Sequence, residues 1–496
     1  MARRISHWVD GAPAEGTSGR VGPVFNPATG EQSGEVDLAS AAEVDRAVAS
    51  ARSAAAQWRE SSLSSRAAIL FKFRELLHDR AGELAEIITS EHGKVLSDAM
   101  GEVARGLENA EFATGIPNLL KGDHSEQASG GVDVYSIRQP IGVVAGITPF
   151  NFPAMVPLWM CTTAIACGNA FILKPSEKDP SASLLMARLW QEAGLPDGVF
   201  TVVHGDREAV DAILAHPDIA AVSFVGSTPV ARHVYETGTR HGKRVQALGG
   251  AKNHMVVLPD ADVDMAADAA VSAAYGSAGE RCMAISVVVT VGDVADPLVD
   301  AIATRLPKLR IGAGTDPDSE MGPLITREHR DRVASYVDAG RGEGATVVAD
   351  GRGADVPADG FFLGVSLLDH VRPEMSVYAD EIFGPVLCVV RAQTYAEAVE
   401  LVNANPYGNG AAIFTRDGGA ARQFEFDVQA GMVGVNVPIP VPVAYYSFGG
   451  WKNSLFGDTH AHGVEGVHFF TRGKVVTSRW LDPSHGGLNL GFPTHD

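Results

Sequence analysis

The sequence predicts an α/β fold with two doubly wound parallel sheets and a small additional β unit. From residue 141 onward, short apolar runs alternate with helical stretches, as expected for a parallel sheet. A second alternating series begins near residue 253 and continues to about residue 436. The 496 residues exceed what one compact core holds, so two or three domains are expected.

Composition narrows the class of protein. Apolar residues make up 45% and glycine contributes 54 residues, as in ordinary α/β proteins. The net charge of −20 is spread along the chain, which argues against a nucleic-acid partner. It does not exclude an anionic small-molecule substrate. Four cysteines without a CxxC pair predict neither a disulfide framework nor a metal site, and favour a reducing, cytoplasmic location.

No segment predicts a secretory signal or a membrane helix. The first residues contain two arginines but no apolar core of a signal peptide. Residues 139–173 lack charged side chains until Lys174, yet glycines and prolines interrupt this stretch repeatedly. Buried parallel strands with a crossover helix explain such a pattern better than a membrane span does.

The elements follow in order along the chain. Apolar residues at three- and four-residue spacing predict helices between residues 41 and 118. Strands are predicted at IGVVAGI, AFILK, VFTVVHG and IAAVSFVGS, and the two helices among them end at Gly194 and Gly242. DVYSIRQP and GKVVTSRW fit neither series; they could pair with each other or with another subunit.

A nucleotide site is expected at the ends of the first strands, although the GxGxxG fingerprint is absent. In FVGSTPVA, Ser227 or Thr228 can cap a helix that begins near Pro229, and such a helix start binds phosphate. In ILKPSEKDP, Lys174 and Glu177 stand where ligands bind, and a carboxylate there accepts ribose hydroxyls and repels a 2′-phosphate. An unliganded capped helix and a solvated turn explain the same residues.

Two further segments hold candidate catalytic groups. Asn151 is the one amide side chain among the prolines and phenylalanines of ITPFNFP, so it is either a structural clamp or a donor to an oxyanion. Cys282 follows Arg281 in SAGERCMAIS and is either packing or a nucleophile. The other cysteines, Cys161, Cys167 and Cys388, lie in apolar runs and are expected in the core.

Six motifs in one order, ITPFNFP, KPSE, FVGST, LGGAKN, GERC and EIFGP, resemble the aldehyde dehydrogenase superfamily over essentially the whole chain. This resemblance implies an NAD-binding domain at residues 1–121 and 140–248 and a catalytic domain at residues 249–461. It also implies an oligomerisation unit at residues 122–139 and 462–496, and a homotetramer. No metal is implied.

The resemblance also assigns roles to residues. Cys282 would be the nucleophile, and Asn151 with the Cys282 backbone amide would hold the oxyanion. The NAD contacts that it implies are Thr148, Phe150, Lys174, Glu177, Lys178, Ser227, Gly249 and Glu381.

One family feature is missing. Hydrolytic members carry a glutamate at the head of an ELGGK motif, which activates water; here QALGGAKNH places Leu248 there, beside Ala247. Water needs such a base far more than a thiol does, because a thiol already ionises near pH 8.5. The change therefore favours coenzyme A as the acyl acceptor, with Glu280 as the replacement base if water is used instead.

Two arginines point to the substrate. Arg281 could lower the Cys282 pKa, form a structural ion pair or bind a substrate carboxylate. Arg105 lies between Glu102 and Glu108 in GEVARGLENAEF, which by itself suggests a helix-surface ion pair. Together with GERCMA and GAKNH, this segment resembles the CoA-acylating methylmalonate-semialdehyde dehydrogenases, in which the matching arginines hold the substrate carboxylate.

This branch implies NAD-dependent oxidation of methylmalonate or malonate semialdehyde with decarboxylation to propanoyl-CoA or acetyl-CoA. The two semialdehydes differ by one methyl group, so valine and inositol catabolism are both compatible with the sequence. The alternatives are a hydrolytic semialdehyde dehydrogenase and a catalytically silent paralogue; the intact Cys282 and Asn151 argue against the silent paralogue.

Overall fold

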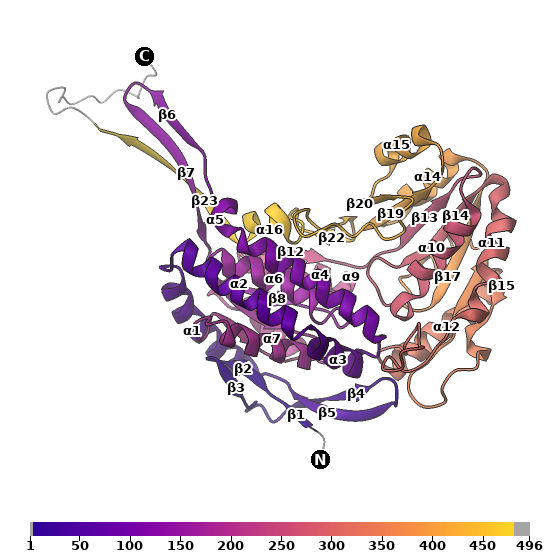
Figure 1. Cartoon of the computed structure of the whole chain (residues 1–496), viewed down its shortest axis with the longest axis horizontal. Coiled ribbons are helices and arrows are strands. Elements are labelled where there is room, and N and C mark those ends of the chain that lie inside the picture. Colours follow the sequence, from indigo (N-terminus) through magenta and orange to yellow (C-terminus); the bar gives the residue numbers. More distant parts are fainter. Residues whose placement is uncertain (1–2, 481–496) are drawn as a thin grey trace.

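The computed structural model describes residues 3–480 and contains two large sheets, each flanked by helices, and an arm that projects from the body (Figure 1). Within these residues, no helix is long and apolar enough to cross a membrane. The predicted α/β class with parallel sheets is confirmed.

The first sheet has eight strands, and its five central strands are parallel. In spatial order they are β22 (Leu455–Phe456), β12 (Arg244–Leu248), β11 (Ile219–Val225), β8 (Val143–Ile147), β9 (Ala170–Lys174), β10 (Phe200–Val202), β2 (His7–Val9) and β3 (Ala12–Ala14). The chain leaves β8 toward β9 and β10, and later returns on the other side of β8 with β11 and β12. Such a switch point opens a crevice at the carboxyl ends of the strands, where ligands bind.

Helices cover both faces of this sheet, in two separate apolar clusters. One face carries α2 (Leu63–Asp79), α3 (Ala81–His92), α4 (Leu96–Thr114), α6 (Met155–Ala166) and α7 (Ser181–Glu192). The other face carries α1 (Ala41–Trp58), α8 (Arg207–Ala215) and α9 (Thr228–Arg240). The predicted helical region is confirmed and ends with α5 (Ile116–Leu119); the apolar run after residue 63 divides into α2 and α3 because Arg80 leaves the helical conformation.

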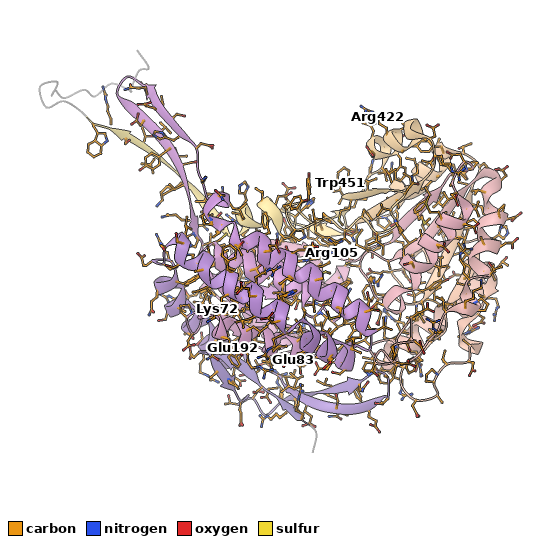
Figure 2. All side chains as sticks on the ribbon, viewed as in Figure 1. Lys72, Glu83, Arg105, Glu192, Arg422 and Trp451 are labelled. Carbon is orange, nitrogen blue, oxygen red and sulfur yellow. The ribbon has the colours of Figure 1, made fainter. Side chains whose placement is uncertain are left out.

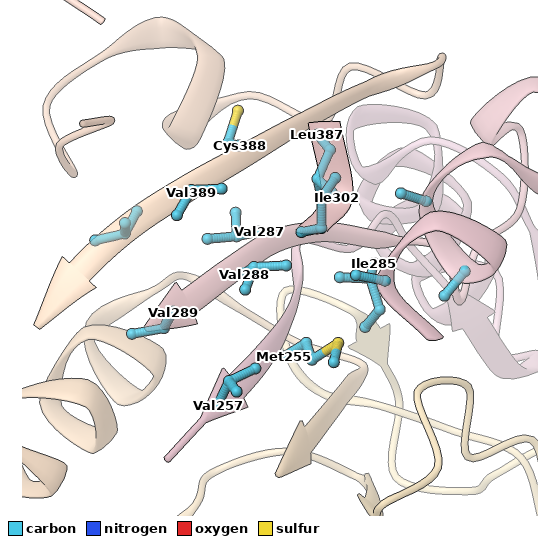
Figure 3. Packing of buried hydrophobic residues seen from close by; sticks show 14 of the residues in the cluster. Met255, Val257, Ile285, Val287, Val288, Val289, Ile302, Leu387, Cys388 and Val389 are labelled. Atoms are coloured by element: carbon cyan, nitrogen blue, oxygen red, sulfur yellow. The ribbon is translucent and has the colours of Figure 1, made fainter. Parts of the chain in front are cut away.

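The second sheet has seven strands, all parallel to their neighbours except the edge strand β15. In spatial order they are β15 (Thr346–Ala349), β16 (Ser366–Asp369), β17 (Val386–Ala392), β14 (Ile285–Val291), β13 (Asn253–Val257), β19 (Gly410–Phe414) and β20 (Met432–Val435). Its central strands are nearly all apolar because both faces are buried. Figure 3 shows Val287, Val288 and Val289 of β14 between Met255 and Cys388.

Six helices pack around this second sheet in one continuous apolar cluster. They are α10 (Val263–Tyr275), α11 (Ala295–Ala303), α12 (Arg327–Glu343), α13 (Ser376–Ala379), α14 (Tyr395–Ala404) and α15 (Gly418–Asp427). Because β13, β14 and β19 are parallel, the residues just before each strand meet at one edge of the sheet. That edge holds the turn with Cys282.

The arm is a three-stranded antiparallel sheet that joins distant parts of the chain (Figure 1). Its strands are β6 (His124–Ser129), β7 (Val132–Pro140) and β23 (Thr471–Arg479), the last preceded by α16 (Gly463–Phe469). β7 and β23 pair along their whole length, so the two outlying strands of the sequence pair with each other. Residues 481–496, part of the predicted tail, lie outside the described residues.

Shorter strands escaped the sequence prediction. β1 (Arg3–Ile5), β4 (Val21–Asn26) and β5 (Glu31–Asp37) form a small sheet, and β18 (Tyr407–Gly408) pairs with β21 (Trp451–Lys452). These strands are short and mix exposed with buried positions, so they lack a clear apolar pattern.

Candidate active site

The carboxyl edge of the first sheet gathers four of the expected cofactor contacts. Thr148 follows β8, Lys174 ends β9, Ser227 follows β11 and Gly249 follows β12. The amide of Thr148 donates to the Lys174 carbonyl at 3.1 Å, which holds the first two segments together. The edge lies at the switch point between β8 and β11, where the fold opens a ligand crevice.

Lys174 and Glu177 form an ion pair at this edge. Lys174 Nζ lies 3.1 Å from Glu177 Oε2. Burial by itself raises the pKa of Glu177, but the charge of Lys174, hydrogen bonds from the backbone and from Lys174, and the charge of Lys178 together outweigh burial and leave this pKa below its usual value. Lys178 Nζ lies 4.8 Å from the centre of the Phe150 ring. Two further expected cofactor contacts, Phe150 from the loop after β8 and Lys178 from the loop after β9, therefore lie against each other.

The start of α9 is open to a ligand. Ser227 occupies the N-cap position, but its side chain makes no capping hydrogen bond and is exposed. The Thr228 hydroxyl accepts a hydrogen bond from the Gly250 amide at 2.9 Å instead. The expectation that a Ser227 or Thr228 hydroxyl caps this helix is therefore wrong, and the helix start remains available to phosphate.

Gly249 is required by close packing. A Cβ atom there would lie 2.6 Å from the Asn453 carbonyl oxygen, so no larger residue fits without a shift. Its neighbour Gly250 likewise leaves space for the carboxylate of Glu381, whose Oε1 accepts a hydrogen bond from the Ala251 amide at 2.9 Å. Gly249 and Gly250 thus allow Glu381 to lie beside the carboxyl edge of the first sheet.

Cys282 lies in a strained turn between α10 and β14. Ser277 and Ala278 have φ values of 54° and 52°, in the left-handed region that non-glycine residues rarely adopt. Gly279 follows with φ 74°, and a Cβ there would lie 2.3 Å from the Gly384 carbonyl. Backbone strain of this kind is characteristic of functional turns.

A small cavity brings Cys282, Arg281 and Glu381 together, with Ala251 and Phe383 also in its wall. Burial and then the charge of Glu381 raise the pKa of the Cys282 thiol to about 12, opposed by backbone N–H groups and by Arg281. Burial also raises the pKa of Glu381 to about 7. The cavity therefore brings together a thiol, a cation and a carboxyl group whose pKa lies near neutral pH.

Asn151 lies in the buried loop after β8. Lys94 Nζ donates to its backbone carbonyl at 2.6 Å and to Glu102 Oε2 at 2.8 Å. Within residues 3–480 the Asn151 side-chain amide makes no hydrogen bond, so the loop is held by its backbone and the amide stays available to a ligand. Glu102 also accepts from the Ala154 and Met155 amides, so it caps α6 and is no surface partner of Arg105.

The position expected for a water-activating carboxylate holds Leu248, which is buried at the end of β12. Glu280, the replacement candidate, is fully buried and does not line the Cys282 cavity. Its Oε1 accepts from the Ile325 amide at 3.2 Å and lies 3.4 Å from His329, while His92 lies 3.8 Å from Oε2. Burial raises the pKa of Glu280 to about 8.

Both candidate substrate arginines form ion pairs that involve α4. Arg281 Nη2 pairs with Asp98 Oδ1, and both side chains are mostly buried. Arg105, which is labelled in Figure 2, lies two helical turns after Asp98 on the same helix face. It pairs with Glu108 at 3.1 Å. The surface ion pair foreseen for Arg105 is present, with Glu108 alone as its partner.

Several residues around the site gave no signal in the sequence. Lys94, His92 and His329 hold the Asn151 loop and Glu280, but each occurs alone in an ordinary helical or loop segment. Asn253 lies inside the LGGAKN motif, but nothing in that motif distinguishes its side chain as functional. The three core cysteines behave as expected: all are buried, and burial raises their pKa values. Residues 3–480 contain no cluster of metal ligands.

Comparison with known proteins gives full-length matches. The sequence model of the aldehyde dehydrogenase family matches residues 14–476. The malonate-semialdehyde dehydrogenase of Pseudomonas aeruginosa is 56% identical over 481 residues, which are 96% of this chain and 97% of that protein. Malonate-semialdehyde dehydrogenase 2 of Geobacillus kaustophilus is 49% identical over 477 residues, 96% and 99% of the two chains.

Solved structures agree with these sequence matches. A Sinorhizobium meliloti protein assigned to the methylmalonate-semialdehyde dehydrogenases, crystallised in complex with NAD, is 55% identical with a TM-score of 0.96 and coverages of 97% and 99%. The methylmalonate-semialdehyde dehydrogenase of Oceanimonas doudoroffii is 54% identical with a TM-score of 0.96 and coverages of 98% and 99%.

Proposed function

The chain belongs to the aldehyde dehydrogenase family, and from this membership we propose that it oxidises malonate or methylmalonate semialdehyde with NAD and coenzyme A. The products are acetyl-CoA or propanoyl-CoA, each one carbon shorter than the semialdehyde. The observation that carries this proposal is the cavity in which Cys282 meets Arg281 and Glu381 while the base position holds Leu248.

The described residues fit NAD. The uncapped start of α9 with the free Ser227 hydroxyl suits the pyrophosphate, and the ionised Glu177 suits ribose hydroxyls. Thr148, whose hydroxyl is buried without a partner in residues 3–480, would lie beside the bound dinucleotide, with Glu381 at its other end. When bound, NAD accepts the hydride that leaves the substrate carbon.

The acylation step follows from Cys282 and Asn151. The thiolate adds to the aldehyde carbon, and the oxyanion that forms accepts hydrogen bonds from the Asn151 amide and the Cys282 backbone N–H. Loss of hydride from this adduct leaves a thioester on Cys282. Asn151 can donate because the structure leaves its amide unbonded within the described residues.

The single carboxylate of the substrate explains the arginines and the decarboxylation. Arg281 and Arg105 would bind this carboxylate by charge-assisted hydrogen bonds. A thioester with a β-carboxylate releases CO2, because the electron pair of the broken C–C bond passes to the thioester oxygen as an enolate. Asn151 donates to that same oxygen, and protonation at carbon completes the step.

The acyl acceptor is a thiol in this proposal. Coenzyme A attacks the thioester, forms acyl-CoA and returns the Cys282 thiol. Water would need a base, but Leu248 offers none, and Glu280 is enclosed by Ile325, His92 and His329. A thiol needs less assistance because its pKa lies several units below that of water.

Rapid mixing of the enzyme with NAD and malonate semialdehyde tests this proposal. Without coenzyme A, we expect a burst of about one NADH per active site followed by slow turnover, because the acyl-enzyme persists. Coenzyme A should convert the burst into steady turnover and give acetyl-CoA. Fast, steady formation of free acid without coenzyme A would contradict the proposal.

Variants of the cysteines provide matched controls. Cys282→Ala should abolish the burst and keep NAD binding, whereas Cys161→Ala and Cys388→Ala should retain the burst, since both are core residues.

The four free thiols also fit a reducing location such as the cytoplasm. We further propose a homotetramer assembled through the arm, in which Val475 is 70% exposed.

A further inference from the structure

The carbonyl group of Cys282 accepts hydrogen bonds from two side-chain amides. Asn253 Nδ2 lies 2.9 Å and Asn409 Nδ2 lies 3.2 Å from this oxygen. Both asparagines are buried, with 2% and 4% of their surface exposed. Asn253 begins β13 and Asn409 directly precedes β19, at the sheet edge that also holds the Cys282 turn. We call this pair the amide clamp.

The surroundings determine how both amides are oriented. Asn253 Nδ2 also donates to the Ala284 carbonyl at 2.9 Å, and its Oδ1 accepts from the Gly410 amide at 3.0 Å. Asn409 Nδ2 also lies 2.9 Å from Met283 Sδ, a thioether sulfur that is a weak hydrogen-bond acceptor. In each case acceptors surround the nitrogen, so the amide nitrogen faces Cys282.

The clamp acts on one peptide plane. The Cys282 carbonyl and the Met283 N–H belong to the same planar peptide unit and point in opposite directions. The backbone N–H groups of Met283 and Cys282 act on the Cys282 sulfur and lower the pKa of the thiol. Fixing the carbonyl therefore fixes the direction of the N–H, and hydrogen bonds on the carbonyl polarise the peptide and strengthen that donor.

The cavity makes such a donor necessary. Burial and Glu381 both raise the pKa of the thiol, while the charge of Arg281 is already paired with Asp98. Backbone N–H groups can stabilise the Cys282 thiolate without an additional charged side chain. A thiolate gains from them only if the turn holds them on the sulfur.

We propose that Asn253 and Asn409 are positioning residues that hold the Cys282–Met283 peptide so that its N–H stabilises the thiolate. This inference rests on the proposed function of Cys282 as the nucleophile and extends it to the way in which the reactive thiolate is formed. Neither asparagine contacts substrate in this proposal; both act through the backbone of the turn.

Alkylation of Cys282 in the full-length protein tests the clamp. Iodoacetamide reacts with the thiolate, and peptide mass spectrometry assigns the modified cysteine. We expect Asn409→Ala and Asn253→Ala each to slow this reaction by roughly fivefold at pH 7–9, the effect of one net hydrogen bond. Asn405→Ala is the matched control, because this buried amide bonds the Tyr407 N–H and leaves the turn untouched.

A second reagent separates thiolate formation from access. The bulkier N-ethylmaleimide also needs the thiolate, so both reagents should slow by the same factor. Unequal factors, an unchanged rate, or an equal loss in Asn405→Ala would overturn the proposal. If Asn253→Ala does not fold, because it also loses the Gly410 bond, Asn409→Ala decides alone. The assay measures no turnover, so its failure leaves the proposed reaction standing.

Discussion

At the residue scale, Arg281 is the group whose role the structure makes most testable. Its guanidinium lines the Cys282 cavity and is held by Asp98 on α4. A paired cation has a reduced effect on the thiol, yet it still presents donors to a second carboxylate. The arrangement therefore favours substrate recognition over activation of the thiol.

We expect Arg281→Leu and Arg105→Leu each to lower kcat/KM for malonate semialdehyde by about ten- to a hundredfold, the value of one charge-assisted bond. Propanal has no carboxylate, so kcat/KM for propanal should change little. Asp98→Asn is the matched control, because it removes the competing anion and keeps the size of the side chain. Equal losses for the two aldehydes would instead indicate a structural or activating role.

Glu280 gives a second prediction at this scale, through pH. Burial raises the pKa of Glu280 to about 8, above the value of about 4.3 in an unfolded chain. Between these values the folded protein binds the proton more tightly, so this group lowers the free energy of unfolding as pH rises through that window. Lys94, Lys178, His92 and His329 are the titratable groups around it.

Glu280→Gln removes this pH dependence because the amide does not ionise. We expect the Tm of the variant to rise relative to the original protein by roughly 2 °C or more between pH 5 and pH 9. Differential scanning calorimetry across this range provides the measurement. Parallel Tm curves for the two proteins would show that Glu280 titrates normally or that its neighbours compensate.

Single residues were predictable where a motif fixed them and hidden where only the fold brings them together. Leu248 at the base position and Cys282 are visible in the sequence. Asn409 lies 127 residues from Cys282 in the chain, and no periodic pattern marks such a contact. Asp98 is hidden for the same reason, since its partner Arg281 comes from the other half of the chain.

At the element scale, the join between α3, α4 and α6 depends on one buried ion pair. Lys94 Nζ and Glu102 Oε2 lie 2.8 Å apart, and both side chains are completely buried. Glu102 caps α6 through the Ala154 and Met155 amides, while Lys94 holds the Asn151 carbonyl. The ion pair therefore links three helices to the loop that carries Asn151, the proposed oxyanion donor.

Lys94→Met leaves the Glu102 carboxylate buried without its partner, which should lower the free energy of unfolding by about 3–5 kcal/mol in urea titrations. The double variant Lys94→Met/Glu102→Gln should recover much of this stability, because the remaining amide can still cap α6. It should not recover the NADH burst, since the Asn151 loop has lost its anchor. Full recovery of the burst would show that Lys94 does not position Asn151.

Elements with a strong pattern were predicted well. The parallel strands from β8 to β11 are largely apolar runs, and α1 carries an apolar stripe, so local sequence determines both. β12 was not predicted, because Arg244 and Gln246 interrupt its apolar residues. The break at Arg80 and the short strands β1 to β5 were missed. A helix boundary without glycine or proline, strands of three residues such as β1, and the largely polar, partly exposed β4 and β5 carry too little local signal.

At the scale of the whole molecule, the arm requires an explanation. β6, β7 and β23 leave the body as a narrow three-stranded sheet (Figure 1). A sheet of this kind has little core of its own, and Val475 of β23 is 70% exposed. Trp480, directly after β23, is 90% exposed. Exposed apolar side chains on a projecting sheet support the proposal that a second chain covers this surface. The sequence indicated this arm only through two strands that fit neither of the two alternating strand–helix series.

Sedimentation of the full-length protein tests the assembly that we propose. The original chain should sediment as a homo-oligomer, and Val475→Lys should shift it toward smaller species because a lysine charge on the arm opposes burial between subunits. Phe71→Lys, a matched change at an exposed apolar residue of α2, should leave the oligomer intact. A dissociated Val475→Lys protein should still show an NADH burst, since Cys282, Asn151 and the amide clamp all come from one chain. Sedimentation of the original protein as a monomer would rule out the arm as an assembly surface, because its apolar residues would then face water in the native state.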